Sequence, residues 1–348
     1  MPKLYRGNLA EMLEPYNTAK IIREESIMPL YHKGESGDVT ITLMNDVKKI
    51  LSVRTATLEK TFAEGKDYFV KDGKLVIPAD SEISIIPWEE YNPDEGSFDC
   101  TLGGKLLFGS ANSLHLRQYA VTYIPASNIF EGKYFPTKSE NLEKSRKLLT
   151  EREFKLAFFG DSITYGCNSS GLYEGVPPYL PIYPQMVAQY LRLKNFKIDY
   201  YNPSIGGKSS PWGRDTAAYY FDEFRPDLTV IAFGMNDGTG KLPVDSFIGN
   251  IKSIIGTIRK NNPNAEFILT ATTLPNPIST FTGLQPDYEK PLESLAKEEG
   301  CAFLDMTELH RILLTRKEYQ HMTGNNINHP TDFLARLYAQ GILALLGV

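Results

Sequence analysis

An apolar run that ends in Gly-Asp-Ser is the feature of this sequence that most constrains its fold. The segment Lys155-Leu-Ala-Phe-Phe-Gly-Asp-Ser-Ile-Thr-Tyr-Gly166 begins like a buried strand, and Gly160 allows a sharp turn where that strand would end. Ligands of an open parallel sheet bind just beyond the carboxyl ends of the strands, so this turn would present the Ser162 hydroxyl to a substrate. The same sequence would also suit a strand-to-helix turn in which Ser162 only caps the following helix. The rest of the chain has to decide between the two interpretations.

Strands and helices alternate after about residue 153. The segments 227–233 and 265–270 are short and almost wholly apolar, as strands buried in a parallel sheet are, and 302–305 resembles them. Between the first two, apolar residues recur at helical spacing, and the run 333–346 predicts a closing helix. Repeated alternation of this kind predicts a three-layer α/β domain with a mostly parallel sheet over residues 151–348.

The first 150 residues have a different texture. Apolar and polar residues alternate over 38–44, as in a half-buried strand, and Asp72-Gly73 separates two strand-like runs within 67–77, which is a strong hairpin signal. Further apolar runs lie at 83–86, 105–108 and 114–123. Many short strands with little helix predict an N-terminal β-sandwich over residues 1–150, with a polar linker at about 126–153.

The composition argues against several classes of protein. A net charge of -5, with no basic run, disfavours a nucleic-acid or anionic-membrane partner. The N-terminus lacks the apolar core of a signal peptide, and no stretch is long enough to span a bilayer. The three cysteines lie far apart and form no metal-ligand cluster, so a reduced, cytoplasmic location without a metal site is expected.

Four polar islands carry the candidate chemistry. They are Gly160-Asp161-Ser162, the segment 202–209, Gly234-Met-Asn236-Asp237, and Asn326-Ile-Asn-His329-Pro330. Each of the first three follows a predicted strand, which for the second is the strand-like segment 198–201, so they should converge on one edge of the sheet. The fourth precedes the last helix, in a loop that can return to the same edge.

These islands contain the groups that acyl transfer needs. A serine hydroxyl is a poor nucleophile until a base takes its proton, and His329 could be that base for Ser162. The N–H groups of Ser162 and Gly207, together with the Asn236 amide, could bind the oxyanion that develops.

The four islands resemble the four blocks of the SGNH hydrolase superfamily, also called the GDSL esterases. Ser162, Gly207, Asn236 and His329 stand at the family's Ser, Gly, Asn and His, in the family's order. The resemblance covers about residues 153–348 and implies a flavodoxin-like α/β/α fold. It also implies that Ser162 is the nucleophile and His329 the base. The oxyanion hole would consist of Ser162, Gly207 and Asn236, and no cofactor would be needed.

One position departs from the family pattern. The family usually places an Asp three residues before the catalytic His, where it orients the ring, but this chain has Asn326 there. An Asn carries no charge to stabilise an imidazolium. A backbone carbonyl could hold the ring and leave a Ser-His dyad, or Asp332 or another carboxylate could reach the ring from a different direction. The dyad is favoured because Asp332 also suits the first turn of a helix.

A β-sandwich ahead of an SGNH domain resembles, in architecture only, the two-domain bacterial carbohydrate acetylesterases, whose first domain is a jelly roll. The sequence therefore predicts a serine esterase that removes a short acyl group, acetyl foremost, from an oligosaccharide or another small carbohydrate-like ester. Candidate substrate contacts are Asp161, Tyr165 and Trp212. Two alternatives stay open: a lipid acylhydrolase or thioesterase, which would need a long apolar groove, and a catalytically weak carbohydrate-binding protein on an esterase fold. Assembly into a homo-oligomer also stays open.

Overall fold

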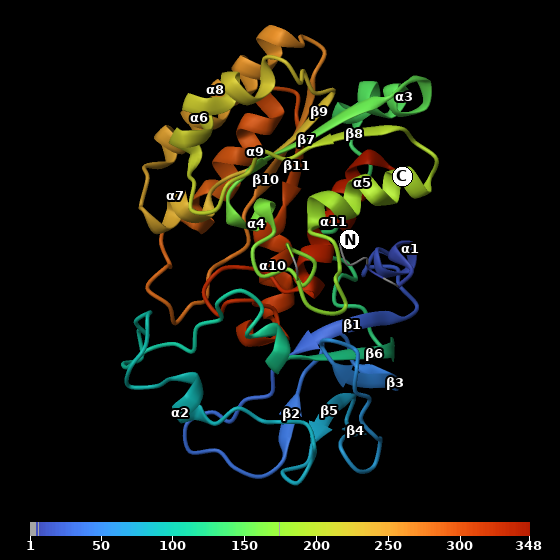
Figure 1. The fold of residues 1–348 in the computed structure, drawn as a ribbon, viewed down its shortest axis with the longest axis vertical. Helices are drawn as coiled ribbons and strands as arrows, with labels where there is room; N and C mark the ends of the chain where they lie inside the picture. Colours follow the sequence, from blue (N-terminus) through green and yellow to red (C-terminus); the bar gives the residue numbers. More distant parts are fainter. Residues whose placement is uncertain (1–4, 6, 174) are drawn as a thin grey trace.

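Five parallel strands form the central sheet of the larger part of the molecule (Figure 1). The structure is a computed structural model and describes residues 5, 7–173 and 175–348. The strands are β7 (Phe154–Gly160), β8 (Ile198–Tyr201), β9 (Leu228–Ala232), β10 (Glu266–Ala271) and β11 (Ala302–Asp305). Their order across the sheet is β8-β7-β9-β10-β11, so the order along the chain reverses between β7 and β9. This is the flavodoxin-like order, and it confirms the predicted parallel α/β part.

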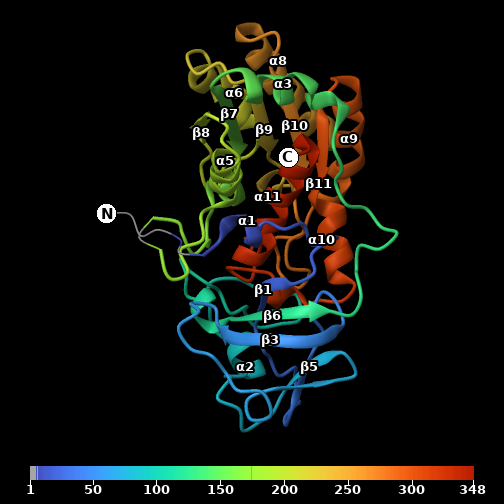
Figure 2. The same ribbon diagram turned by 90° about the vertical axis from the view of Figure 1, so that its right-hand side faces the viewer.

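Helices cover both faces of this sheet (Figures 1 and 2). Successive residues of β7 point to opposite faces: Leu156 and Phe158 belong to one apolar cluster, and Ala157 and Phe159 to the other. The first cluster is completed by α3 (Glu143–Glu151), α5 (Tyr183–Leu193), α10 (Met306–Leu314) and α11 (Asp332–Leu346). The second is completed by α6 (Ser210–Phe221), α8 (Val244–Asn261) and α9 (Glu289–Glu298).

Two of these helices show how the sequence pattern determines burial. In α8 the buried apolar residues recur at helical spacing, as predicted, and face the sheet: Phe247, Ile251, Ile254, Ile255 and Ile258. Helix α11 is buried along nearly its whole length, since the sheet lies on one side and other elements cover the rest. Among them, Tyr16 stacks on Phe333, and Arg336 donates to the Glu24 carbonyl of β1.

The N-terminal part contains two antiparallel sheets of three strands each. One has the order β1-β6-β3 and the other β2-β5-β4, and the strands are β1 (Ile22–Ile27), β2 (Val39–Ile41), β3 (Val47–Thr55), β4 (Phe69–Lys71), β5 (Lys74–Ile77) and β6 (Tyr119–Pro125). The predicted hairpin is confirmed: Lys71 pairs with Lys74 across Asp72-Gly73, whose φ angles are 51° and 72°. Two consecutive positive φ values are typical of the turn that this dipeptide favours.

Several predicted strands of the N-terminal part are absent. The runs 83–86 and 105–108 make only isolated bridges, Leu30 to Ile86 and Asp99 to Lys105. Ile86 and Leu106 of these runs pack instead in a small cluster with Ile327 of the loop before α11, so burial in a loop produced the apolar signal. The segment 114–123 divides into a 3₁₀ turn and β6, and the expected linker 126–153 contains α3. Strands β1 and β3 were not predicted.

Short helices and turns complete the chain. The remaining helices are α1 (Leu9–Met12), α2 (Trp88–Tyr91), α4 (Ser162–Tyr165) and α7 (Met235–Thr239), and the 3₁₀ turns are His115–Arg117, Glu140–Leu142, Gln285–Tyr288 and Tyr319–His321. Within the described residues, no helix has the length and apolarity needed to cross a membrane.

The two parts share one apolar core. Ile27, Val53 and Tyr123 of the antiparallel sheets belong to the same buried cluster as Phe158 and Leu337. A buried ion pair between Glu25 of β1 and Lys317, after α10, joins the two parts, and Glu25 also accepts from Met44 N–H and Tyr123 O–H, both at 2.7 Å. Removing either partner would leave a buried charge unpaired, so a change at this junction would be strongly destabilising.

The ring cluster behind β7 provides a test of the fold. The Phe159 ring is fully buried, with Trp212, Phe221 and Phe233 at centroid distances of 5.2–5.4 Å. We expect Phe159→Ala to lower the free energy of unfolding by about 3–5 kcal/mol, since it leaves a cavity in a packed core. Tyr219→Ala is the matched control, because that ring is 84% exposed and its loss should cost less than about 0.5 kcal/mol. Equal shifts of the denaturation midpoint in the two variants would contradict this packing.

Candidate active site

Ser162 lies where β7 gives way to α4. Gly160 pairs with Ala232 of β9, and a Cβ at Gly160 would stand 2.4 Å from the Ala232 carbonyl oxygen, so only glycine fits there. Asp161 then caps α4 by accepting from the Ile163 N–H at 2.9 Å. Ser162 is the first residue of that helix and is 5% exposed. Its hydroxyl therefore stands at the carboxyl end of β7, beside the reversal of strand order.

The loop before α11 brings His329 to the serine. The His329 Nε2 lies 2.8 Å from the Ser162 Oγ. The backbone of this loop is tightly held, because the Asn325 Oδ1 accepts from the N–H groups of Ile327, Asn328 and His329. The His329 carbonyl in turn accepts from the Gly324 N–H at 2.8 Å. The serine and the histidine thus form the hydrogen-bonded pair that the sequence predicted.

The partner of the other ring nitrogen is one that the sequence analysis missed. The Asn168 Oδ1 lies 2.6 Å from the His329 Nδ1. The Asn168 amide nitrogen donates to two carbonyls of the N-terminal part, those of Gly109 (3.3 Å) and Ala111. Asn168 follows the glycine that ends α4 and has a φ of 65°, which an Asn tolerates better than most residues. An Asn soon after a Gly predicts a turn, but it does not predict a contact with His329.

The predicted orienting groups lie elsewhere, which corrects the expectation. The Asn326 Oδ1 accepts from the Tyr91 hydroxyl and the Asn276 amide, and its own amide donates to the Leu107 carbonyl, each at 3.1 Å. Asn326 is fully buried in these contacts and ties together three loops. Asp332 is the first residue of α11, and its Oδ1 accepts from the Ser170 N–H at 3.0 Å. The expected backbone carbonyl is not the partner either, because the Asn168 side chain occupies that place.

Burial determines the charge state of the groups around Ser162. It lowers the pKa of His329 to about 4, and it raises the pKa of the nearby Cys167 thiol to about 11. Burial also raises the pKa of Asp161 to about 7. At neutral pH the imidazole is therefore neutral and able to accept a proton, whereas the thiol is protonated and inert as a nucleophile.

The predicted oxyanion donors lie at the same edge of the sheet. The Gly160 N–H donates to the Ser204 Oγ, which ties the following turn, 205–208, to β7. Gly207 has a φ of 75° in this turn, and in the described part of the chain no acceptor takes its exposed N–H. Asn236 follows β9 and donates one amide hydrogen to the Lys208 carbonyl at 2.8 Å. Among the described residues no acceptor takes the other amide hydrogen, which lies beside the turn.

A family model matches the second half of the chain. The model of the GDSL-like lipase/acylhydrolase family matches residues 158–336, about half of the chain. The chain belongs to this family. It is therefore an esterase by family, and all four blocks lie within the matched segment. A comparison with curated protein sequences gives no match.

Solved structures of carbohydrate esterases match more than half of this chain. A catalytic mutant of an acetylxylan esterase from Geobacillus stearothermophilus is 17% identical, with 57% of this chain and 97% of that chain covered and a TM-score of 0.48. A two-domain esterase active on acetylated mannans is 21% identical, with 60% of this chain and 52% of that chain covered and a TM-score of 0.48. At such identities the likeness does not extend to the substrate.

None of the three candidate substrate contacts of this GDSL protein lines the cavity beside His329. Asp161 is buried and serves as the cap of α4. Trp212 packs on Phe159 and Phe233 in the core. Tyr165 is half-buried and packs against Tyr173 at a centroid distance of 5.9 Å, with the rings edge to face. Of these rings it is Tyr173, 76% exposed, that reaches the cavity.

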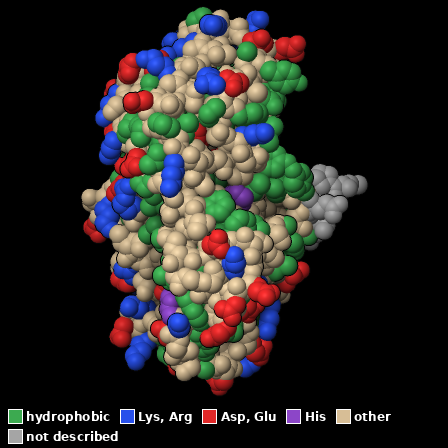
Figure 3. All heavy atoms as spheres, turned by 90° about the vertical axis from the view of Figure 1, so that its left-hand side faces the viewer, with side chains coloured by type: hydrophobic (Ala, Val, Ile, Leu, Met, Phe, Trp, Pro, Cys, Tyr) green, Lys and Arg blue, Asp and Glu red, His purple; other side chains and the backbone are tan. Residues whose placement is uncertain are grey.

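The cavity that His329 lines has a volume of about 540 Å³. The N-terminal part contributes one wall, from Phe108 to Asn112, and the loop after α4 contributes the other, with Cys167, Asn168, Leu172 and Tyr173. Figure 3 shows hydrophobic side chains gathered across the middle of one face of the molecule, beside a histidine. The site thus lies between the two parts of the chain, and both parts shape it.

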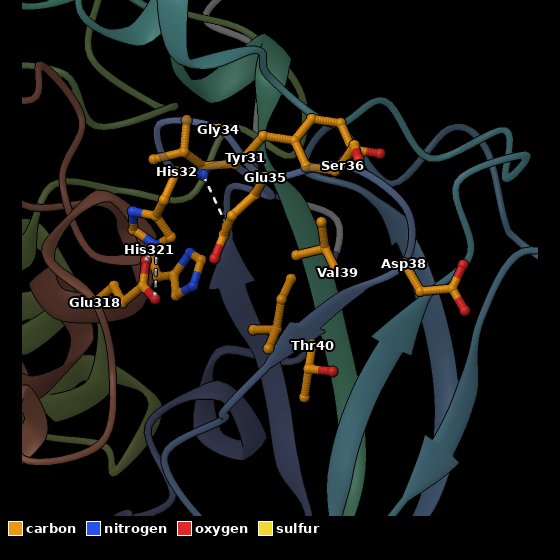
Figure 4. A pocket seen from close by; sticks show the side chains of 12 residues that line it. Tyr31, His32, Gly34, Glu35, Ser36, Asp38, Val39, Thr40, Glu318 and His321 are labelled. Carbon is orange, nitrogen blue, oxygen red and sulfur yellow. Dashed lines mark hydrogen bonds and ion pairs between the residues drawn. The ribbon is translucent and has the colours of Figure 1, made fainter.

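A second cavity, of about 510 Å³, is lined mostly by residues 30–41 of the N-terminal part, and Glu318 and His321 of the second part complete it (Figure 4). Glu35 accepts there from the His32 N–H at 2.9 Å, and the His32 Nε2 lies 3.3 Å from Glu318. Neither Ser162 nor His329 lines this cavity. Among the described residues, no three His, Cys, Asp or Glu side chains are grouped to hold a metal ion.

The charge state of His329 can be measured directly. Because burial disfavours the charged ring, we expect His329 to titrate near pH 4 and to stay neutral at pH 6, where an imidazole in water is largely protonated. Long-range ¹H–¹⁵N correlation spectra recorded over this pH range report the titration, and His329→Ala assigns the signal. A midpoint near 6.5 would contradict the burial of this ring.

Proposed function

We propose that this chain is a serine esterase that removes a short acyl group, acetyl foremost, from a carbohydrate-like ester. The observation that carries the proposal is the 2.8 Å hydrogen bond between the Ser162 Oγ and the His329 Nε2 at the switch point of the sheet. A hydroxyl bonded to a neutral imidazole, whose other nitrogen is also bonded, has the geometry of an activated nucleophile.

The reaction follows from the positions of these groups. His329 takes the Ser162 proton as the Oγ attacks the ester carbonyl, and the carbonyl oxygen becomes an oxyanion. The N–H groups of Ser162 and Gly207 and the free amide hydrogen of Asn236 stabilise that charge. His329 then gives the proton to the leaving alcohol, and water hydrolyses the acyl-enzyme with the same base. No step calls for a cofactor.

The cavity supports a bulky alcohol. The group that receives the proton has to lie on the histidine side of the serine, and His329 lines the cavity of about 540 Å³. That volume falls in the range of ordinary ligand sites. The leaving alcohol is therefore placed in the cavity between the two parts, with the exposed Tyr173 ring as a stacking surface for a sugar.

The division of labour along the chain is part of the proposal. Residues 1–150 form a β-sandwich unit of jelly-roll type that completes the alcohol site, and residues 151–348 carry the chemistry. A cytoplasmic location remains the prediction of the sequence.

A second candidate activity, on lipid esters or thioesters, has one observation in its favour. Phe108, Leu172 and Tyr173 make much of the cavity wall apolar. Hydrolysis of p-nitrophenyl esters of increasing chain length separates the two activities: the proposal expects the highest kcat/KM at two to four carbons. A maximum at eight carbons or more would favour the lipid activity instead.

The nucleophile is tested by Ser162→Ala. We expect the variant to lose at least about 10³-fold of the rate of p-nitrophenyl acetate hydrolysis, because no other group can form the acyl-enzyme. Ser253→Ala is the control, since that hydroxyl only donates to the Gly249 carbonyl on the exposed side of α8. Near-background rates in both the wild type and Ser162→Ala would instead indicate a carbohydrate-binding protein on an esterase fold.

The oxyanion hole is tested by Asn236→Ala. Removal of one such donor should lower kcat by about 10²–10³-fold and change KM little, because the bond forms only as charge develops. Asn236→Asp should be at least as damaging, since a carboxylate would face the oxyanion. Full activity in Asn236→Asp would remove Asn236 from the hole. Thermal unfolding of both variants shows whether the lost bond to Lys208 affects the fold.

A further inference from the structure

We propose that Asn168 is the positioning residue that orients His329, and that the N-terminal segment 109–111 holds Asn168 in place. The N-terminal part would then be a working component of the active site and not only a wall of its cavity. This inference rests on the proposed esterase function, and it extends that function by making catalysis depend on a contact between the two parts of the chain.

The hydrogen bonds around Asn168 determine which atom faces the histidine. The carbonyl oxygens of Gly109 and Ala111 can only accept, so the group directed at them has to be the amide nitrogen. The carbonyl oxygen of the same side chain is thereby turned toward the His329 Nδ1, at 2.6 Å.

The same bonds determine the tautomer of the ring. Because the Asn168 Oδ1 can only accept, the proton of the neutral imidazole has to be on Nδ1. The Nε2 is then free to accept from the Ser162 hydroxyl, as a general base requires. The chain of bonds runs from two backbone carbonyls through Asn168 and His329 to Ser162, with every donor matched to an acceptor.

Gly109 also contacts Asn325, whose side chain holds the His329 backbone. Its N–H donates to the Asn325 carbonyl at 3.2 Å, and the Asn325 side chain accepts from the His329 N–H at 3.0 Å. Gly109 therefore touches both holders of the histidine, one with its carbonyl and one with its N–H. A Cβ at this position would lie 2.8 Å from the Gly324 carbonyl oxygen and 2.5 Å from Leu114, so any side chain would push the segment away.

An amide differs from a carboxylate in what it does to the base. It holds the ring but adds no negative charge, so nothing beside Nδ1 favours the imidazolium. Titratable groups on the adjoining segments are Cys167, which lines the same cavity, and Asp161 and Asp332, which accept from backbone N–H groups of Ile163 and Ser170. With a neutral partner, the ring stays unprotonated and active as a base in mildly acidic solution.

The pH profile of Asn168 variants tests this role in the full chain. Asn168→Asp keeps an acceptor at Nδ1 and adds a charge, so the acid limb of kcat/KM should move up by about 1–3 pH units. Asn168→Ala removes the acceptor, so kcat should fall by about 10- to 10³-fold with little change in KM, and Asn168→Asp should recover part of that loss at high pH. A residue that only stabilised the loop would leave the acid limb unmoved in both variants.

Asn262→Ala is the matched control for these variants. It also removes an amide that donates to a backbone carbonyl, that of Pro226 at 2.8 Å, in the loop that leads into β10 and away from the site. Its kcat and pH profile should match those of the wild type. An unchanged acid limb in Asn168→Asp, with activity still dependent on Ser162, would overturn the inference and leave the esterase function standing.

A double-mutant cycle tests the contribution of the segment 109–111. Gly109→Ala should lower kcat because it displaces the carbonyls that hold Asn168. Asn168→Ala breaks the same chain of hydrogen bonds as Gly109→Ala. The double variant should therefore have a kcat no lower than that of the slower single variant. Losses that multiply would show that the segment acts independently of Asn168. Thermal unfolding of each variant establishes that the rates compare folded proteins.

Discussion

The close pairing of β7 with β9 is the constraint on which the rest of the site depends. Gly160 and Ala232 approach so closely that no side chain fits at Gly160, and the chain can turn at once into α4. The same pairing places the end of β9, and with it Asn236, beside the end of β7. Because the order of strands reverses between these two, the helices that follow them leave on opposite faces of the sheet, and the edge between them stays open. The proposed nucleophile and a proposed oxyanion donor can share this edge because the backbone geometry, and not a flexible loop, brings them together.

The groups that follow directly from a strand were predictable from the sequence, and the groups that depend on contacts between loops were not. Ser162, Gly207 and Asn236 each come after a strand of the parallel sheet, so their place at the edge follows from the sheet. Asn168 orients the histidine through contacts with Gly109, Ala111 and His329. These residues lie 59, 57 and 161 positions away along the chain, and no local sequence pattern encodes such contacts. Asn326 was chosen by its spacing from His329. Its side chain is instead used to tie Tyr91 and Asn276 to the same loop, because a buried amide has to satisfy its own hydrogen bonds first.

The same distinction explains the N-terminal part. The hairpin at Asp72-Gly73 was predictable because a two-residue turn has a local requirement for positive φ angles. The runs 83–86 and 105–108 have the composition of strands, yet Ile86 and Leu106 are buried against Ile327 of the loop that carries the histidine. The apolar residues of these loops are thus buried by contacts with the second part of the chain. The sequence of residues 1–150 alone does not reveal such contacts. The shared apolar core and the buried ion pair of Glu25 and Lys317 also show that burial in the N-terminal part depends on contacts with the second part of the chain.

A neutral partner for the base suits a site assembled between two parts. A carboxylate at position 168 would stabilise the imidazolium, but it would also face the carbonyls of Gly109 and Ala111, which offer no hydrogen, and an unpaired buried charge is costly. An amide satisfies both sides: its nitrogen bonds the carbonyls and its oxygen bonds the ring. The loss is the charge that would favour proton transfer to His329. The gain is a ring whose orientation is fixed by the contact between the two parts, so the proposed base is held in place only when the cavity proposed for the alcohol is also complete.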